Sequence, residues 1–252
     1  NQCFSVEKDN GKMLFLGACG MSKEVLSELN QSLLRHFKEK GIENAFYYEP
    51  LFDYYWLQKE KIGICNLEPY DNGSHENFMG LKKVDNEVID YWYGSKTFQR
   101  TLKMFQLITK KLETGGYVTE KDLAECDNKN VDMVVEKDLG TSLYFNFRLT
   151  VGKHSKESTD EIVEFYNDSF YQEYFRNFVK ATELNMLIVT GQTGCALMNK
   201  IYPDLHLEYN KAPKRLENLL ICSAPHPAAR NYSNKDLVDN INYFFDCYWE
   251  KA

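Results

Sequence analysis

The sequence predicts an α/β fold: a three-layer α/β/α sandwich around a mainly parallel four-stranded central sheet. Four short segments, at 62–65, 142–145, 186–189 and 219–222, are continuously apolar. Continuous rather than alternating hydrophobicity is typical of strands that are covered on both faces. Helical patterns alternate with these segments, as a mainly parallel sheet requires. The chain shows no internal repeat or linker, so we expect a single domain over residues 1–252.

The amino-terminal part of the chain contributes one helix before the first buried strand. Residues 13–17 form a short strand or an apolar lead-in. Residues 22–40 have apolar side chains at helical spacing between an N-capping serine and a terminating glycine. The strand at 62–65 ends before Pro69, which cannot donate a hydrogen bond to a neighbouring strand.

The remaining helices fall between and after the other strands. We predict an amphipathic helix at 97–112, a long aromatic-rich helix at 160–181 and a closing helix at 235–249. A further helix starts at residue 195. The Gly-Gln-Thr-Gly run at 191–194 is interpreted as a tight strand-to-helix turn, whose N–H groups are suited to hold a phosphate.

Composition excludes several classes of protein. The formal net charge of −7 argues against nonspecific binding to nucleic acid. Seven cysteines lie singly with no Cys-x-x-Cys pair, and no histidines stand at ligand spacing, so we expect no metal site and no cofactor. No apolar run is long enough to cross a membrane, and no signal peptide is visible. We therefore expect a monomer in the cytoplasm, or in the nucleus of a eukaryote.

Three chemically useful side chains follow three of the predicted strands. Glu68 follows the first, Asn146 ends the second and His226 follows the fourth. In parallel sheets the ligand site lies beyond the carboxyl ends of the strands, so these side chains should share one cleft. A carboxylate can orient water, an amide can bind the edge of a heterocycle, and a histidine can stabilise a developing anion.

At these strand ends the sequence resembles the uracil-DNA glycosylase superfamily, and most closely its classical branch. Four runs match in order over residues 22–249: Asn-Leu-Glu-Pro-Tyr-Asp at 66–71, Tyr-Phe-Asn-Phe-Arg-Leu-Thr-Val at 144–151, Ile-Val-Thr-Gly-Gln-Thr-Gly-Cys-Ala at 188–196, and Pro-His-Pro-Ala-Ala at 225–229. The Asn-x-x-Leu-Thr-Val and His-Pro matches are the specific ones. The resemblance implies the fold of that superfamily over a single glycosylase-like domain.

The resemblance also implies a mechanism in which a nucleotide is flipped out of DNA into a pocket. Glu68 then positions water and stabilises the cationic sugar, while neutral His226 hydrogen-bonds the departing base. Asn146 reads the base, and Tyr70 lines the pocket. Phe78 is the expected stacking ring; the alternative is an ordinary core phenylalanine.

This chain departs from the pattern of the superfamily around the base. Glu68 replaces an aspartate, which moves the carboxylate outward by about 1.5 Å. Leu67 replaces a glutamine that contacts the base, and Asn66 replaces a glycine. The intercalating leucine after His-Pro is missing, and Arg230 is the candidate substitute, since a guanidinium can stack on bases; alternatively it is a solvated surface residue. The candidate DNA-binding residues are Lys153, Ser155, Lys156, Arg230 and Asn231.

We therefore expect a monofunctional, metal-free DNA glycosylase that hydrolyses the N-glycosidic bond of uracil or of a modified or bulky pyrimidine. The setting would be base-excision repair or defence against chemically modified viral DNA, with single-stranded or duplex DNA as the partner. The alternative hypothesis is a noncatalytic relative that binds nucleic acid or a protein partner through the same cleft.

Overall fold

The structure is a computed structural model. It describes residues 8–9, 12–13, 18–42, 45, 47–50, 52–67, 96–123, 135–150 and 156–250. The strands are β1 (Lys8–Asp9), β2 (Lys12–Met13), β3 (Ile62–Asn66), β4 (Leu143–Asn146), β5 (Met186–Thr190), β6 (Lys214–Leu216) and β7 (Leu219–Ala224). The α-helices are α1 (Ala18–Glu39), α3 (Lys96–Thr114), α5 (Lys156–Phe165), α6 (Ser169–Ala181), α7 (Gly191–Ile201) and α8 (Asn234–Trp249). Short helical turns lie at Asp53–Leu57, Glu120–Asp122 and Val135–Leu139.

The central sheet has five strands in the order β4-β3-β5-β7-β6. The first four are parallel, and β6 pairs antiparallel with β7 at the edge. The α/β class and the four predicted buried strands are confirmed, but the strand count of four was too low. The prediction missed β6 because a three-residue Lys-Arg-Leu edge strand is neither apolar nor buried, and so gives no periodic signal.

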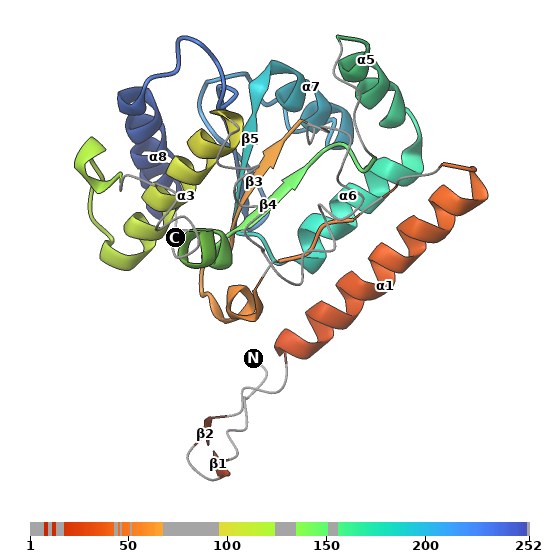
Figure 1. The fold of residues 1–252 in the computed structure, drawn as a ribbon, viewed down its shortest axis with the longest axis horizontal. Coiled ribbons are helices and arrows are strands. Elements are labelled where there is room, and N and C mark those ends of the chain that lie inside the picture. Colours follow the sequence, from red (N-terminus) through yellow and green to blue (C-terminus); the bar gives the residue numbers. More distant parts are fainter. Residues whose placement is uncertain are drawn as a thin grey trace.

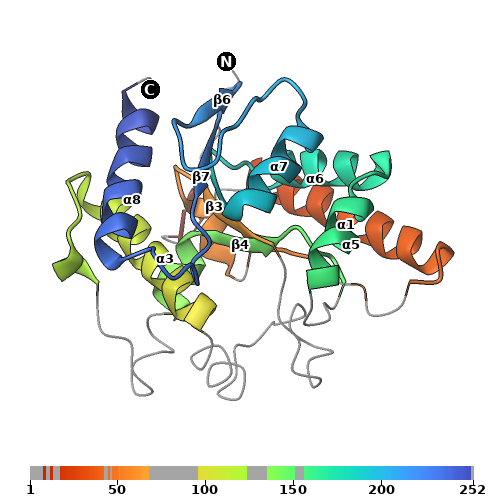
Figure 2. The same ribbon diagram turned by 90° about the horizontal axis from the view of Figure 1, so that it is seen from above.

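Helices cover both faces of the sheet (Figures 1 and 2). On one face, Ile64, Ile188 and Cys222 pack in a buried cluster with side chains of α3 and α8. On the other face, Cys65 and Val189 belong to a second cluster, built with α1, α5, α6 and α7. Burial on both faces explains why these strands are continuously apolar.

Three of the helix predictions had the wrong bounds. The helix predicted at 22–40 is α1, which begins at Ala18, so Ser22 lies inside the helix and is not its N-cap. The predicted helix at 160–181 is two helices, because Asp168 caps α6 by accepting a hydrogen bond from the Phe170 N–H at 2.9 Å. An N-capping aspartate starts a new helix instead of continuing the old one. The predicted turn at 191–194 is the first turn of α7, which begins at Gly191 with a φ of 80°.

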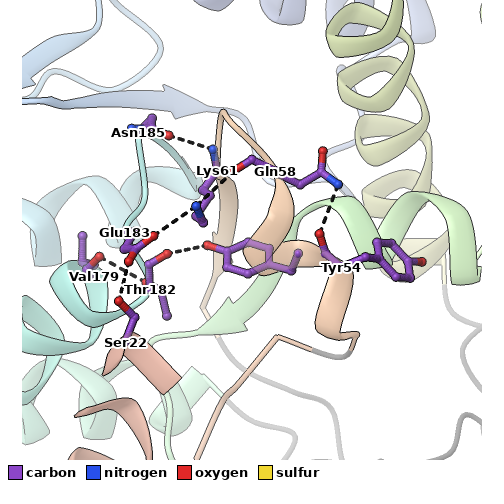
Figure 3. A network of polar contacts seen from close by, with 9 residues as sticks. Ser22, Tyr54, Gln58, Lys61, Val179, Thr182, Glu183 and Asn185 are labelled. Carbon is purple, nitrogen blue, oxygen red and sulfur yellow. Dashed lines mark hydrogen bonds and ion pairs between the residues drawn. The ribbon is translucent and has the colours of Figure 1, made fainter. Parts of the chain in front are cut away.

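A network of polar contacts ties the sheet together at the amino ends of β3 and β5 (Figure 3). The Lys61 backbone N–H donates to Asn185 Oδ1 at 2.8 Å, and Lys61 Nζ lies 3.0 Å from Glu183 Oε2. Ser22 of α1 donates to the other oxygen of Glu183, and the Tyr55 hydroxyl donates to the carbonyl of Thr182 at 2.7 Å. These contacts join α1, the 53–57 turn and the α6–β5 connection at the edge of the sheet opposite the strand ends that carry the predicted site.

We predict that Gly194→Ala destabilises the protein by about 1 kcal/mol, because α7 lies too close to β5 to admit a Cβ. A Cβ at Gly194 would lie 2.9 Å from Val189 Cγ1 and 3.3 Å from Phe147 Cε2. Overpacking of this kind costs about 1–3 kcal/mol, which outweighs the ~1 kcal/mol that alanine gains over glycine in a helix. Urea unfolding at constant m-value measures the change.

Gly116→Ala, just after α3, is the control for an added Cβ without a close contact, since a Cβ there would meet only Thr114 Oγ1, at 3.7 Å. A Gly194→Ala variant at least as stable as the wild type would show that α7 can shift away from β5.

Candidate functional site

The parallel strands bring the predicted site residues to one edge of the sheet. Asn66 ends β3, Asn146 ends β4 and Thr190 ends β5, while His226 follows β7 by two residues. Pairing of β3 with β4 continues past the strand ends, because the Phe147 N–H donates to the carbonyl of Asn66 at 3.0 Å. Strands β4 and β7 are separated by β3 and β5, which places their axes about 14 Å apart.

Asn146 is buried, with 1% of its surface exposed, and both ends of its amide are hydrogen-bonded. Its Nδ2 donates to the Tyr48 hydroxyl at 2.7 Å, and its Oδ1 accepts from the Tyr144 hydroxyl at 3.4 Å. Each bond uses one of the two donors or one of the two lone pairs of the amide. Asn146 therefore retains one N–H and one lone pair with which to bind a ligand, but a ligand reaches them only if neighbouring groups move.

Asn66 is also buried, and both N–H donors and one lone pair of its amide are used inside the protein. Its Oδ1 accepts from Thr190 Oγ1 at 2.6 Å, and its Nδ2 donates to Thr101 Oγ1 and to the Tyr144 hydroxyl, both at 3.3 Å. Thr190 stands at the N-cap position of α7 but makes no side-chain cap. Its hydroxyl donates its proton to Asn66 Oδ1, so Thr190 links the start of α7 to the end of β3.

His226 is half-buried and is held as a neutral imidazole. Its Nδ1 accepts the Ala228 backbone N–H at 3.1 Å, so the ring proton resides on Nε2. Burial lowers the pKa of the imidazole from its ordinary value of 6.5, because desolvation disfavours the charged form. The first residue of α7 packs beside it: a Cβ on Gly191 would lie 3.8 Å from His226 Cβ. The side chain thus offers one N–H donor at the carboxyl edge of the sheet.

The loop that carries His226 is fixed where it enters α8. Tyr232 is buried, and Arg100 of α3 both donates to its carbonyl and lies 5.5 Å from its ring centre. Ser233 and Asp236 form a capping box at the start of α8. Between these anchors and the histidine, Arg230 and Asn231 are exposed. The loop therefore presents an arginine to solvent from a firmly held backbone.

A small pocket lies next to the residues that follow β4. It has a volume of about 140 Å³ and is lined by Ile42, Arg148, Leu149, Thr150, Glu161, Ile162 and Phe165. The Tyr48 hydroxyl connects it to Asn146 by donating to the carbonyl of Arg148 at 3.5 Å. The Arg148 guanidinium is paired with Glu161 at 2.9 Å, so it is already engaged within the protein.

The structure places only part of the predicted site. Asn146, His226 and the half-buried Leu67 lie at one edge of the sheet, and Arg230 and Asn231 share the loop of His226. Glu68, Tyr70, Phe78, Lys153 and Ser155 lie outside the described residues. Lys156 begins α5, but its side chain is outside the described part.

Sequence reasoning missed the partners that surround Asn146. Tyr144 precedes it by two residues, so the period of a strand could have placed both side chains on one side of the sheet. Thr190 ends a buried strand in the same way as Asn66. No sequence signal points to Tyr48, which is 98 residues away from Asn146 along the chain.

Over the described ranges, no three His, Cys, Asp or Glu side chains are grouped as a metal site. None of the helices in that part of the chain has both the length and the apolar composition needed to span a bilayer.

A scan against protein-family models and a search of curated proteins found no match to this chain.

We predict that His226 titrates below pH 6.5 and that its neutral form carries the proton on Nε2. As the pH falls through 6.5, the unfolded chain takes up a proton that the folded chain does not, so the free energy of unfolding decreases until the lower folded pKa is reached. Side-chain ¹⁵N NMR of the histidines, assigned by comparison with His226→Gln, measures both features. A midpoint above 6.5, or a protonated Nδ1 at neutral pH, would contradict the assignment.

Proposed function

We propose that the protein is a DNA glycosylase that hydrolyses the N-glycosidic bond of uracil or of a modified pyrimidine. The observation that carries the proposal is the neutral His226, which offers an Nε2–H donor at the sheet edge that also holds the Asn146 amide. The proposal also uses the motif resemblance, which assigns complementary roles to these two side chains.

The chemistry needs a donor that acts on the departing base. When the bond between C1′ and the base nitrogen breaks, the electron pair leaves with the base, and negative charge develops on its carbonyl oxygen. A preorganised neutral N–H stabilises that charge without transferring a proton in the ground state. Burial of His226 keeps the imidazole neutral at physiological pH, which suits this role.

The cationic sugar needs a carboxylate and a water molecule on its other side. In the sequence Glu68 follows the last residue of β3 by two positions, and β3 lies between β4 and β7 in the sheet. In the proposed mechanism its carboxylate orients the water that attacks C1′ and accepts the proton that the water loses. The longer side chain, in place of an aspartate, suits a pocket reshaped for a base other than plain uracil.

Asn146 supplies recognition in this proposal. A primary amide matches a pyrimidine edge, since its N–H and its carbonyl pair with an adjacent acceptor and donor. Because the amide is buried, base entry in this proposal is coupled to a rearrangement of the surrounding groups. Such coupling is consistent with an enzyme that takes its base out of a DNA stack.

The direct test is single-turnover incubation with oligonucleotides that carry uracil, hypoxanthine or modified cytosines, followed by alkaline cleavage of abasic sites. We expect excision of at least one modified pyrimidine. We expect His226→Ala to slow excision about 100-fold with DNA affinity nearly unchanged, the signature of an interaction made in the transition state. The exposed His206, which has a φ of 49°, gives the control His206→Asn, expected to cut at the normal rate.

If none of the substrates yielded abasic sites, the proposal would be overturned. If DNA still bound, the noncatalytic alternative would stand in its place.

A second prediction concerns Arg230. The residue is exposed, and among the described residues it has no hydrogen-bonding or ion-pairing partner. If its guanidinium fills the gap left by a flipped nucleotide, Arg230→Ala should slow excision from duplex DNA about tenfold more than excision from single strands, where unstacking costs less. Arg230→Leu should partly restore the duplex rate. Equal losses on both substrates would indicate a phosphate contact instead of a wedge.

A further inference from the structure

A relay of hydrogen bonds crosses the carboxyl edge of the sheet, and its first member has only one possible direction. The Thr101 hydroxyl donates its single proton to the backbone carbonyl of Thr97 at 2.9 Å. A carbonyl can only accept, so toward Asn66 this hydroxyl must act as an acceptor. The atom of Asn66 that lies 3.3 Å from Thr101 Oγ1 is therefore Nδ2.

The direction passes from Asn66 to Asn146 through one tyrosine. The second proton on Asn66 Nδ2 goes to the Tyr144 hydroxyl at 3.3 Å, and Thr190 Oγ1 occupies Asn66 Oδ1 from the other side. The Tyr144 hydroxyl thus accepts from Asn66 and donates its own proton onward, at 3.4 Å. The atom of Asn146 that receives it is Oδ1, the acceptor of the amide.

The far end of the relay agrees with this assignment. With Oδ1 of Asn146 facing Tyr144, its Nδ2 faces the Tyr48 hydroxyl at 2.7 Å. That hydroxyl accepts the proton and donates its own to the carbonyl of Arg148 at 3.5 Å. Both ends of the relay are backbone carbonyls, which cannot reverse. Turning the Asn146 amide by 180° would leave mismatched polar groups in a buried region, which is costly.

We propose that Asn66 and Tyr144 are positioning residues that hold the Asn146 amide in one orientation and thereby select the class of pyrimidine edge that the site accepts. This inference rests on the proposed function. A flipped base is tethered to its sugar and cannot present its edge in reverse. An amide of fixed orientation therefore distinguishes an edge with a carbonyl next to a ring N–H, as in uracil, from an edge with an amino group next to a bare ring nitrogen, as in cytosine.

The resemblance places a glycine at position 66, so neither this asparagine nor the relay that it directs belongs to the matched pattern. The relay also gives a reason for a buried amide whose two N–H donors are both used inside the protein. Asn66 has no N–H left for a ligand, and we infer that its effect reaches a ligand through Tyr144 and Asn146.

Two variants break the relay while leaving the side chain of Asn146 itself unchanged. Tyr144→Phe removes the hydroxyl between the two asparagines. Thr101→Val removes the anchor that sets the direction, and Thr101 is hydrogen-bonded to Asn66 and not to Asn146. Tyr55→Phe is the matched control, because it deletes a buried tyrosine hydrogen bond of 2.7 Å at the opposite end of the sheet.

The first measurement is independent of activity: NOEs from the Asn146 side-chain amide protons, assigned with Asn146→Asp. In the wild type and in Tyr55→Phe we expect them to be stronger to the ring of Tyr48 than to the ring at position 144. In Tyr144→Phe and in Thr101→Val we expect them to be shared between the two rings.

The second measurement is the ratio of single-turnover excision rates for bases with uracil-type and cytosine-type edges. We expect that ratio to move toward one by about tenfold in both relay variants and to be unchanged in Tyr55→Phe.

Unchanged NOEs in both relay variants would overturn the positioning role. Redistributed NOEs with an unchanged ratio of excision rates would overturn the selection of the base edge. If the wild-type protein excised no base while its NOEs followed the expected pattern, the proposed function and the selection of a base would both fall, and the relay would remain as an orienting device for the amide alone.

Discussion

Two primary amides buried at the carboxyl edge of a parallel sheet impose the strictest constraint on this structure. Asn66 and Asn146 are each 1% exposed, and an unpaired buried amide is costly. Tyr144 serves both amides, and Tyr48, Thr101 and Thr190 complete the set. These partners come from β4, β5, α3 and the segment before β3. Satisfying two side chains therefore fixes how four parts of the chain meet.

The strands could be predicted because a strand that is buried on both faces is apolar along its whole length. Residues 62–65 and 186–189 are apolar throughout, and both lie in the middle of the sheet. The predicted helix bounds were wrong where a single residue decides at which position a helix begins. Asp168 starts a new helix by capping it, although the aromatic spacing continues across the break. Gly191 adopts a left-handed φ and begins α7 four residues before the predicted start at residue 195.

The site could be predicted only at the level of which residues share an edge. Parallel strands place Asn146 and His226 on one edge whatever their partners are, so topology alone brings them together. Hydrogen-bond partners follow no period and come from distant segments; Tyr48 approaches Asn146 from across 98 residues of chain. The tautomer of His226 likewise depends on a backbone N–H two residues ahead, a loop geometry that the His-Pro motif does not specify.

Different interactions hold the side chains at the two ends of this sheet edge. On the β4 and β3 side, direct hydrogen bonds fix orientation, and the groups that they link are neutral. On the β7 side, a single N–H from Ala228 fixes the tautomer of His226, and burial is the cause of its lowered pKa. The proposed division of labour follows from this physical difference. The hydrogen-bonded amides at β3 and β4 are suited to binding an uncharged heterocycle. The desolvated imidazole of His226 is suited to stabilising the negative charge that develops on that heterocycle as the bond breaks.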